Sequence, residues 1–481
     1  MIFSELYKKD SMQKTIVVLI LMSYSSLIHA QKYNELTVQT FSITELKKDF
    51  IVWRKTLEKT HANLYLYVSK KELDKTLDSF YTHINTPMTA LEFYSYISPL
   101  VSIIKDGHNY IHPSNNLTEY YNKNALFFPF HVSYLDKRLL IDMNLSTDTT
   151  INVGAEILSI NGIDADTIMN ELLRRMPRDG YNSTYPLWIL NEWFREFYSY
   201  VFGHPTTFNL SIKPVENITL SKTINALSKD SILHTRKKLY PDRVMVNENK
   251  KAITYNNIDS LKTGILKIYT FSHKIKKEYN QSFKKSIKSI FKAIEKNKTE
   301  NLILDLRNNQ GGKSTYGAYL LSYLLDKPFA YVKEYFIVRK TQMNSKDNRL
   351  KKRLVNSTRK TKPNKNSFSG KVFLLINGGS FSNSGIISSI LETLKRAVII
   401  GDETGGNKSV LTSSFSIKTY TTLPNTKIVC DKPDYSTIIR DIDLNDGHGV
   451  FPTHKVIPTI NDIINSNETE LNFTLDLIRR K

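Results

Sequence analysis

Cysteine is almost missing from this chain, since Cys430 is the single one among 481 residues. A lone cysteine excludes an intramolecular disulfide framework and a structural zinc site built on several thiolates. We therefore expect Cys430 to be a packing residue. Hydrophobic residues make up 40% of the chain, which supports sizeable cores, and the length suffices for two or three domains.

Acidic residues are scarce relative to basic ones. The 46 aspartates and glutamates are outnumbered by 67 lysines and arginines, which gives a formal net charge of +21. Such a surface attracts anionic polymers or lipid headgroups. No zinc finger, RNP-type segment or other nucleic-acid module accompanies the charge, so we expect no nucleic-acid partner.

Long apolar runs are missing as well, so we expect no integral membrane segment in a soluble mature protein. A shorter apolar run, Ile16–Met22, follows Lys14 and leads through small and polar residues to Ala30-Gln31. This pattern predicts a signal peptide over residues 1–30 and export to a periplasm or beyond. A buried N-terminal helix is the alternative interpretation.

The most informative segment that is present covers residues 371–408. Val372–Ile376 is an apolar run typical of a buried strand, and the Asn-Gly-Gly sequence at 377–379 permits a sharp turn. Apolar residues recur at helical spacing from Ile386, and Ala397–Ile400 predicts a second strand. The segment therefore predicts a β-turn-α-β unit.

Three serines, Ser380, Ser382 and Ser384, lie where this strand turns into the helix. A hydroxyl at the N-terminus of a helix lies beside unpaired backbone N–H groups that can bind an oxyanion. The alternative is that these serines only cap the helix, because serine is a preferred N-cap residue.

A second strand runs into glycine upstream, in the segment Asn301–Gly312. Glycine lets the backbone approach a ligand closely, so the N–H groups of Gly311 and Gly312 can face the serine turn and complete an anion pocket. Repeated strand-helix-strand units of this kind imply an α/β fold with parallel strands.

Four motifs together indicate a family. In order and rough spacing they resemble the C-terminal processing (tail-specific) serine peptidases: DLRNNQGG at 305–312, NGGSFSNS at 377–384, GDETGG at 401–406 and GHGVFP at 447–452. The resemblance implies a crotonase-like α/β spiral core over residues 255–481, with no metal or organic cofactor.

The resemblance extends more weakly into the N-terminal half. Helical spacing of apolar residues from Phe41 to Ile104 predicts a small helical domain, taken as residues 40–120. Predicted strands follow, and Gly154–Ile163 resembles part of a PDZ domain, which gives a PDZ-like β-rich domain at 125–215. A PDZ-like domain binds a peptide terminus by strand addition, although a scaffold role is the alternative.

The resemblance also assigns the nucleophile. Placing SFSNSG on the family pattern puts it at Ser382. The oxyanion hole would then consist of the N–H groups of Asn383 and of Gly311 or Gly312.

A serine hydroxyl needs a neighbouring base. The lysine that serves tail-specific members falls on Asn407, and Lys408 is one residue late. The DGH sequence ending at His108 resembles instead the motif of the tricorn-type branch, where histidine is the base, and histidine titrates near neutral pH. His112 and His448 are weaker alternatives.

An acid that orients the base completes this chemistry. The resemblance points to Asp446, in the place of the tricorn-type glutamate, and an ordinary Asp-Gly turn is the alternative. Asp106 is the other candidate for orienting His108.

These residues together predict an exported serine peptidase that hydrolyses peptide or protein substrates through an acyl-enzyme on Ser382, with His108 as general base. The alternative is a catalytically inactive scaffold of the same fold that binds a peptide or an apolar ligand. The sequence leaves the oligomeric state open.

Other segments carry weaker predictions. We expect a helix at about 279–297, a polar connection with edge strands at 216–262, and core or lid packing for the aromatic stretch 181–202. The strongly basic segment 340–366 predicts a flexible insertion.

Overall fold

The computed structural model describes residues 37–214, 218–241, 243, 251–338, 345–414, 420–440 and 443–480. The signal peptide predicted at 1–30 lies outside these residues. No helix in the described ranges has both the length and the apolar composition needed to cross a bilayer.

The main sheet has six strands in the order β12-β13-β14-β18-β19-β24. Their bounds are Ile253–Ile258, Thr263–Ile268, Asn301–Asp305, Lys371–Ile376, Ala397–Gly401 and His454–Lys455. All neighbours pair in parallel except β12, which runs antiparallel at the edge. The predicted parallel pairing of the strand-helix-strand units is thus confirmed, and the chain has an α/β fold.

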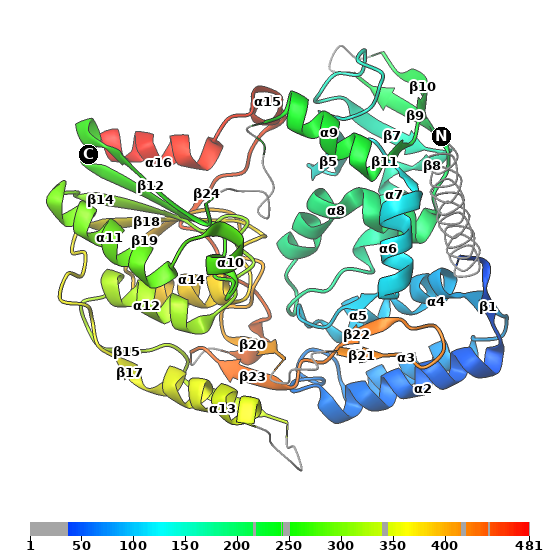
Figure 1. Cartoon of the computed structure of the whole chain (residues 1–481), viewed down its shortest axis with the longest axis horizontal. Helices are drawn as coiled ribbons and strands as arrows, with labels where there is room; N and C mark the ends of the chain where they lie inside the picture. The colour runs from blue at the N-terminus through cyan, green and yellow to red at the C-terminus, as the bar shows by residue number, and fades with distance from the viewer. Residues whose placement is uncertain are drawn as a thin grey trace, which may run out of the picture.

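Helices cover both faces of this sheet (Figure 1). Side chains alternate across a strand, so Leu302 and Leu304 of β14 pack into one apolar cluster and Ile303 into another. The first cluster includes α11 (Phe283–Lys296), α12 (Ser314–Leu324) and α14 (Asn383–Thr393), and the second includes α16 (Thr469–Arg479). Burial on both faces explains why the strands read as continuous apolar runs.

The N-terminal region contains the helices α2 (Ile43–Thr60), α3 (Lys70–Thr82), α4 (Ala90–Ile97) and α5 (Leu100–Ile104). The helical pattern predicted from Phe41 to Ile104 is therefore confirmed. Capping boxes begin the first three of these helices, because a serine or threonine N-cap and a glutamate three residues later bond to each other's backbone.

A hairpin from the C-terminal half extends into this helical region. Its strands are β21 (Tyr420–Thr422) and β22 (Val429–Asp431), and β22 pairs with β3 (Ile111–His112). Cys430 is buried there among the helices, as expected for a packing residue. The two halves of the chain therefore share one apolar core at this point.

A second, antiparallel sheet has the strand order β10-β9-β7-β6-β5, with β8 paired to β7. The bounds of β5 to β10 are Phe130–Leu135, Arg138–Asn144, Glu156–Ile160, Ile163–Asp164, Thr207–Lys213 and Leu220–Asn225. Asn161 and Gly162 both have positive φ and form the turn between β7 and β8. The helix α7 (Ala165–Leu173) follows.

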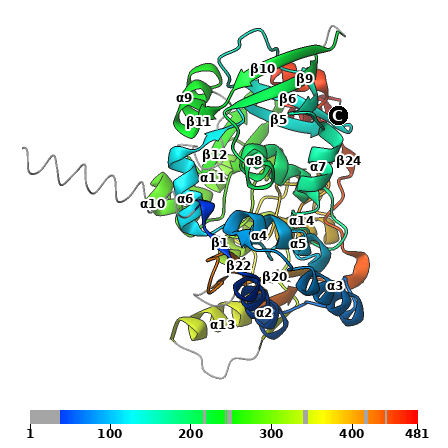
Figure 2. The same cartoon turned by 90° about the vertical axis from the view of Figure 1, so that its right-hand side faces the viewer.

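The aromatic stretch predicted to form core or lid packing contains α8 (Thr184–Phe202). Its buried Trp188, Phe194 and Tyr198 share an apolar cluster with the antiparallel sheet. Figures 1 and 2 both show this sheet above the N-terminal helices, and Figure 1 shows the main sheet beside them.

Three predictions need correction. The basic segment 340–366 contains the helix α13 (Ser345–Thr358), whose sparse apolar residues gave no clear helical spacing. The connection at 216–262 contains α9 (Lys229–Leu239) besides strands. The helix expected at 279–297 is α11, preceded by a short α10 (Ile275–Tyr279) that ends where Asn280 adopts a left-handed conformation.

Candidate active site

Ser382 lies at the tip of the turn that joins β18 to α14. Its φ of 53° and ψ of −115° fall in a region that non-glycine residues rarely adopt, and such a conformation costs about 1–3 kcal/mol. Within the described part of the chain, its side chain makes no capping hydrogen bond. The capping interpretation is therefore wrong for this serine.

The other two serines of the turn are buried. The hydroxyl of Ser380 donates to the carbonyl of Leu306 at 2.8 Å, which ties the turn to the end of β14. Ser384 Oγ lies in the interior, with no hydrogen-bond partner in the described residues. Ser382 is the one of the three whose hydroxyl reaches a candidate base.

That base is His108, from the loop between α5 and β3. Its Nε2 atom lies 3.2 Å from Ser382 Oγ, although 274 residues separate the two in sequence. Burial lowers the pKa of His108, and the nearby charge of Asp106 opposes this shift only in part. The ring is therefore neutral near pH 7 and able to accept a proton.

Aromatic stacking fixes the plane of the His108 ring. The ring stacks on Phe381 with a centroid distance of 4.5 Å, and Phe381 stacks on Tyr185 at 4.0 Å. The Tyr185 hydroxyl in turn lies 2.6 Å from that of Tyr110. A Cβ at Gly107 would come within 2.8 Å of Phe381, which explains glycine at the centre of the DGH sequence.

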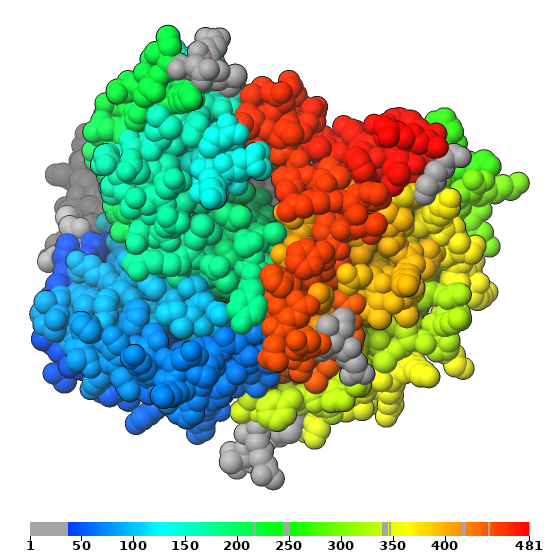
Figure 3. Space-filling model, turned by 180° about the vertical axis from the view of Figure 1, so that it is seen from behind, coloured from blue at the N-terminus to red at the C-terminus, as the bar shows by residue number. Residues whose placement is uncertain are grey.

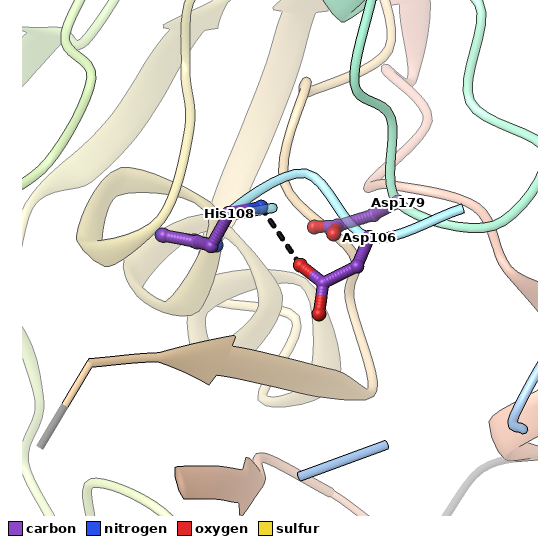
Figure 4. A group of neighbouring side chains, drawn as sticks. All are labelled: Asp106, His108 and Asp179. Carbon is purple, nitrogen blue, oxygen red and sulfur yellow. Dashed lines mark hydrogen bonds between the residues drawn. The ribbon is translucent and has the colours of Figure 1, made fainter. Parts of the chain in front are cut away.

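Two buried carboxyl groups lie beside His108 (Figure 4). Asp106 accepts hydrogen bonds from the His108 N–H at 2.7 Å and the Thr412 hydroxyl at 2.6 Å. His61 Nε2 lies 3.0 Å from the same carboxylate. Burial by itself raises the pKa of Asp106, but hydrogen bonding with His61 and Thr412 and the proximity of two imidazole rings outweigh it, so the pKa is lowered and Asp106 is ionised.

Asp179 is the second carboxyl group, in the loop between α7 and α8. It accepts hydrogen bonds from the N–H groups of Gly107 at 2.7 Å and Asn407 at 3.1 Å. Burial, followed by repulsion from Asp106, raises the pKa of Asp179 to about 7. Sequence analysis missed this residue because Pro177-Arg178-Asp179-Gly180 reads as an ordinary turn.

A metal ion could be held, among the described residues, by Asp106, His108 and Asp179. One ligand atom of each of these residues lies within 4.8 Å of the others. Both carboxyl groups, however, already accept hydrogen bonds from protein donors. The arrangement therefore fits a hydrogen-bonded support for His108 at least as well as a metal site.

The predicted contact between Asp446 and His108 is not formed among the described residues. Asp446 Oδ2 instead lies 2.5 Å from Lys408 Nζ, because a short 3-10 turn, Leu444–Asp446, carries it toward the lysine. His108 Nδ1 is buried, with no hydrogen-bond partner in the described part of the chain.

The alternative bases also lie elsewhere. The Lys408 ammonium is held by Asp446, and His448 Nδ1 lies 3.2 Å from Glu403. His112 is half exposed, with Nε2 3.7 Å from Asp431. Asn407, where the tail-specific lysine would fall, is buried and donates from its side chain to the Tyr67 hydroxyl at 2.8 Å.

Two of the predicted oxyanion-hole residues, Gly311 and Asn383, lie beside Ser382, whereas Gly312 packs against Phe271. A Cβ at Gly311 would lie 2.5 Å from the Asn383 amide and 3.0 Å from Ser382 Cβ, so glycine keeps this space open. The Gly311 N–H donates to Asn309 Oδ1 at 2.9 Å and is not free for an oxyanion, which corrects its predicted role as a donor. The amides of Gly312 and Asn383 have no acceptor among the described residues.

Comparison with known proteins adds a family match. Residues 262–443 match Peptidase family S41. The tail-specific protease of Haemophilus influenzae is 23% identical over 173 residues, which cover 36% of this chain and 21% of that protein. The chloroplastic carboxyl-terminal-processing peptidase 2 of Arabidopsis thaliana is 25% identical over 217 residues, which cover 44% of this chain and 36% of that protein. The chain thus spans about a third or less of these curated relatives.

A solved structure matches over most of the chain. The crystal structure of mature CPAF has a TM-score of 0.64 and 15% sequence identity, and the match covers 90% of this chain and 96% of that one. The structure of mature CPAF complexed with lactacystin gives the same TM-score and covers 91% of this chain. At this identity the likeness concerns the fold alone.

Proposed function

We propose that the chain is a serine peptidase of family S41, with Ser382 as nucleophile and His108 as general base. The observation that carries the proposal is the 3.2 Å separation of His108 Nε2 and Ser382 Oγ, which is within reach of direct proton transfer. Peptides or proteins are the proposed substrates.

In the first step, Ser382 Oγ attacks the carbonyl carbon of the substrate while His108 Nε2 takes the hydroxyl proton. The carbonyl oxygen becomes negative in the tetrahedral intermediate. The amides of Asn383 and Gly312 are the proposed donors to this oxygen, and loss of one such donor typically costs about 10²- to 10³-fold in rate. The N-terminus of α14 adds a favourable dipole.

In the second step, His108 returns its proton to the leaving amine, and the acyl group remains on Ser382. Water then attacks the ester with His108 again as base. Asp106 is the proposed acid that favours the protonated imidazolium, through its charge rather than a direct ring hydrogen bond. This assignment replaces Asp446.

The finer architecture is proposed on the same basis. We assign the α/β region at 255–481 to a crotonase-like core, residues 125–215 to a PDZ-like domain and residues 40–120 to a helical domain that supplies His108. The antiparallel β-rich sheet at β5 to β10 supports the second assignment. Export by a signal peptide at 1–30 is part of the proposal.

A fluorophosphonate probe tests the function directly, because it phosphonylates only an activated serine and releases fluoride. We expect covalent labelling of the full chain, loss of labelling in Ser382→Ala, and retention in Ser384→Ala. Ser384 is the matched control, since it lies two residues away with a buried hydroxyl that bonds to no described residue. Folded wild-type protein that resists the probe and cleaves no casein would reject the proposal in favour of a binding scaffold.

A further inference from the structure

We propose that Asp179 is a positioning residue for His108, acting with Asp106 as a two-carboxyl clamp on the loop that carries the base. The role rests on the proposed peptidase function, because positioning is defined relative to the Ser382 hydroxyl. Asp179 itself touches neither reacting atom.

The clamp holds two successive backbone amides. Asp179 Oδ1 accepts from the Gly107 N–H, and Asp106 Oδ1 accepts from the His108 N–H, each at 2.7 Å. Fixing both N–H groups fixes the direction in which the His108 side chain leaves the backbone. Figure 4 shows both carboxyl groups beside this turn. The stacking of the ring on Phe381 then leaves the imidazole little freedom.

Asp179 also holds the core beside the nucleophile. Its second oxygen accepts from the Asn407 N–H at 3.1 Å. The preceding Gly406 lies against the nucleophile turn, since a Cβ there would come within 2.9 Å of the Ser382 amide. One carboxyl group therefore links the loop of the base to the loop packed against the nucleophile, and so sets the distance between them.

The Asp179 loop is itself held from both sides. The Gly180 N–H donates to the Lys105 carbonyl at 3.0 Å, and the Tyr181 N–H donates to the Gly447 carbonyl at 2.8 Å. Figure 3 shows the N-terminal, middle and C-terminal segments of the chain meeting on one face. The clamp thus depends on three distant segments being assembled together.

The chemistry of the pair suits such a clamp. Two ionised carboxylates this close and this buried repel each other, so one of them retains a proton near neutral pH. A protonated Asp179 beside an ionised Asp106 still offers a carbonyl oxygen to the Gly107 N–H. An amide at position 179 offers the same acceptor, but it cannot accept from the Asn407 N–H through its NH₂ group.

The test compares Asp179→Ala and Asp179→Asn in the full chain. We expect Asp179→Ala to lower kcat and the rate of fluorophosphonate labelling by about 10²-fold, as for a small misplacement of a catalytic group. KM should stay within about threefold, because substrate binding is not the step affected. Asp179→Asn should recover about tenfold of the lost rate, because it keeps the Gly107 contact.

Asp49→Ala is the matched control. Asp49 is equally buried and holds two successive amides, those of Asn425 and Thr426, at 2.9 and 2.8 Å. The Asp49→Ala substitution should lower the melting temperature but leave the labelling rate of the folded protein near that of the wild type. If Asp179→Ala does not fold, the labelling rate and kcat of Asp179→Asn are compared with those of the wild type. A rate about tenfold below wild type then supports the positioning role, and an unchanged rate overturns it.

The outcomes separate the two proposals. A wild-type chain that is not labelled at Ser382 overturns the peptidase function and the positioning role with it. A labelled wild type together with Asp179 variants that react at the wild-type rate overturns the positioning role alone. Equal loss of rate in the Asp179 and Asp49 variants also overturns it, because the effect would then be general destabilisation.

Discussion

Lys408 forms an ion pair with Asp446, with 2.5 Å between Nζ and Oδ2, and neither side chain reaches the Ser382–His108 pair. A lysine side chain that is directed to a carboxylate away from the serine is not placed to take the serine proton. The lysine next to the expected base position is therefore a structural residue in this chain.

The first prediction follows from that ion pair. His108→Ala should lower kcat by about 10³-fold or more, as expected for loss of a triad base, whereas Lys408→Ala should retain most of the turnover. Steady-state hydrolysis of a peptide substrate measures both variants. Loss of turnover in the lysine variant alone, with His108→Ala active, would reverse the assignment of the base.

Gly311 gives a second prediction. Its φ of 91° disfavours any side chain, and a Cβ would lie 2.5 Å from the Asn383 amide, inside the proposed oxyanion hole. Gly311→Ala should therefore lower kcat by about 10²-fold or more, as for loss of an oxyanion donor. Fluorophosphonate labelling and kcat should fall together, since both reactions develop negative charge on an oxygen that the oxyanion-hole amides would bind.

The control for strain is Gly162→Ala. Gly162 also has a positive φ, 78°, but a Cβ there would meet nothing within 4 Å. This variant should lose about 1 kcal/mol of stability from backbone strain and keep its activity. Equal activity of the two alanine variants would show that the space beside Gly311 is not used in the reaction.

The parallel strands of the core were predictable from the sequence because each leaves a local pattern. Ile303 and Phe373 belong to apolar runs that end in glycine-rich turns, and such runs mark strands buried on both faces. The helix α13 was missed because its charged surface hides any apolar face. The spacing of apolar residues in a sequence reflects which side chains are buried. A helix that buries few side chains therefore cannot be recognised from that spacing.

The candidate site was only partly predictable. Motifs singled out Ser382 and His108, and the structure brings the two side chains together. Asp179 and Thr412 were missed because they contact the Asp106–His108 turn from a loop 72 residues away and from the strand β20 (Val410–Ser413) 306 residues away, and a contact between distant segments leaves no local pattern. Asp446 was chosen by motif position alone, which says nothing about where its carboxylate points.

The raised pKa of Asp179 gives a pH prediction. The folded chain holds this proton up to about pH 7, whereas the unfolded chain releases it near the ordinary value of 3.8. Between these values the folded state binds more protons, so the stability contributed by the group falls as the pH rises.

Melting temperatures of wild type and Asp179→Asn from pH 4 to pH 7.5 test this linkage. The wild type should lose stability relative to the variant as the pH rises, because the amide does not titrate. Parallel curves for the two proteins would contradict a shared proton at Asp179. The difference between the curves removes the contributions of groups that both proteins retain.

Arg307 gives the last prediction, on stability. It lies at the end of β14 and is buried, with guanidinium nitrogens 2.8 Å from Asp305 and 2.7 Å from Glu470 of α16. Arg307→Ala leaves the buried Glu470 carboxylate without its cation and leaves Asp305 with Lys267 alone, 3.5 Å away, and breaking such a buried cluster typically costs about 3–5 kcal/mol. The exposed pair of Arg479 and Asp476 is the control, and Arg479→Ala should cost less than about 1 kcal/mol. Urea unfolding of the two variants measures the difference, and similar midpoints would contradict a structural role for the buried cluster in joining α16 to the sheet.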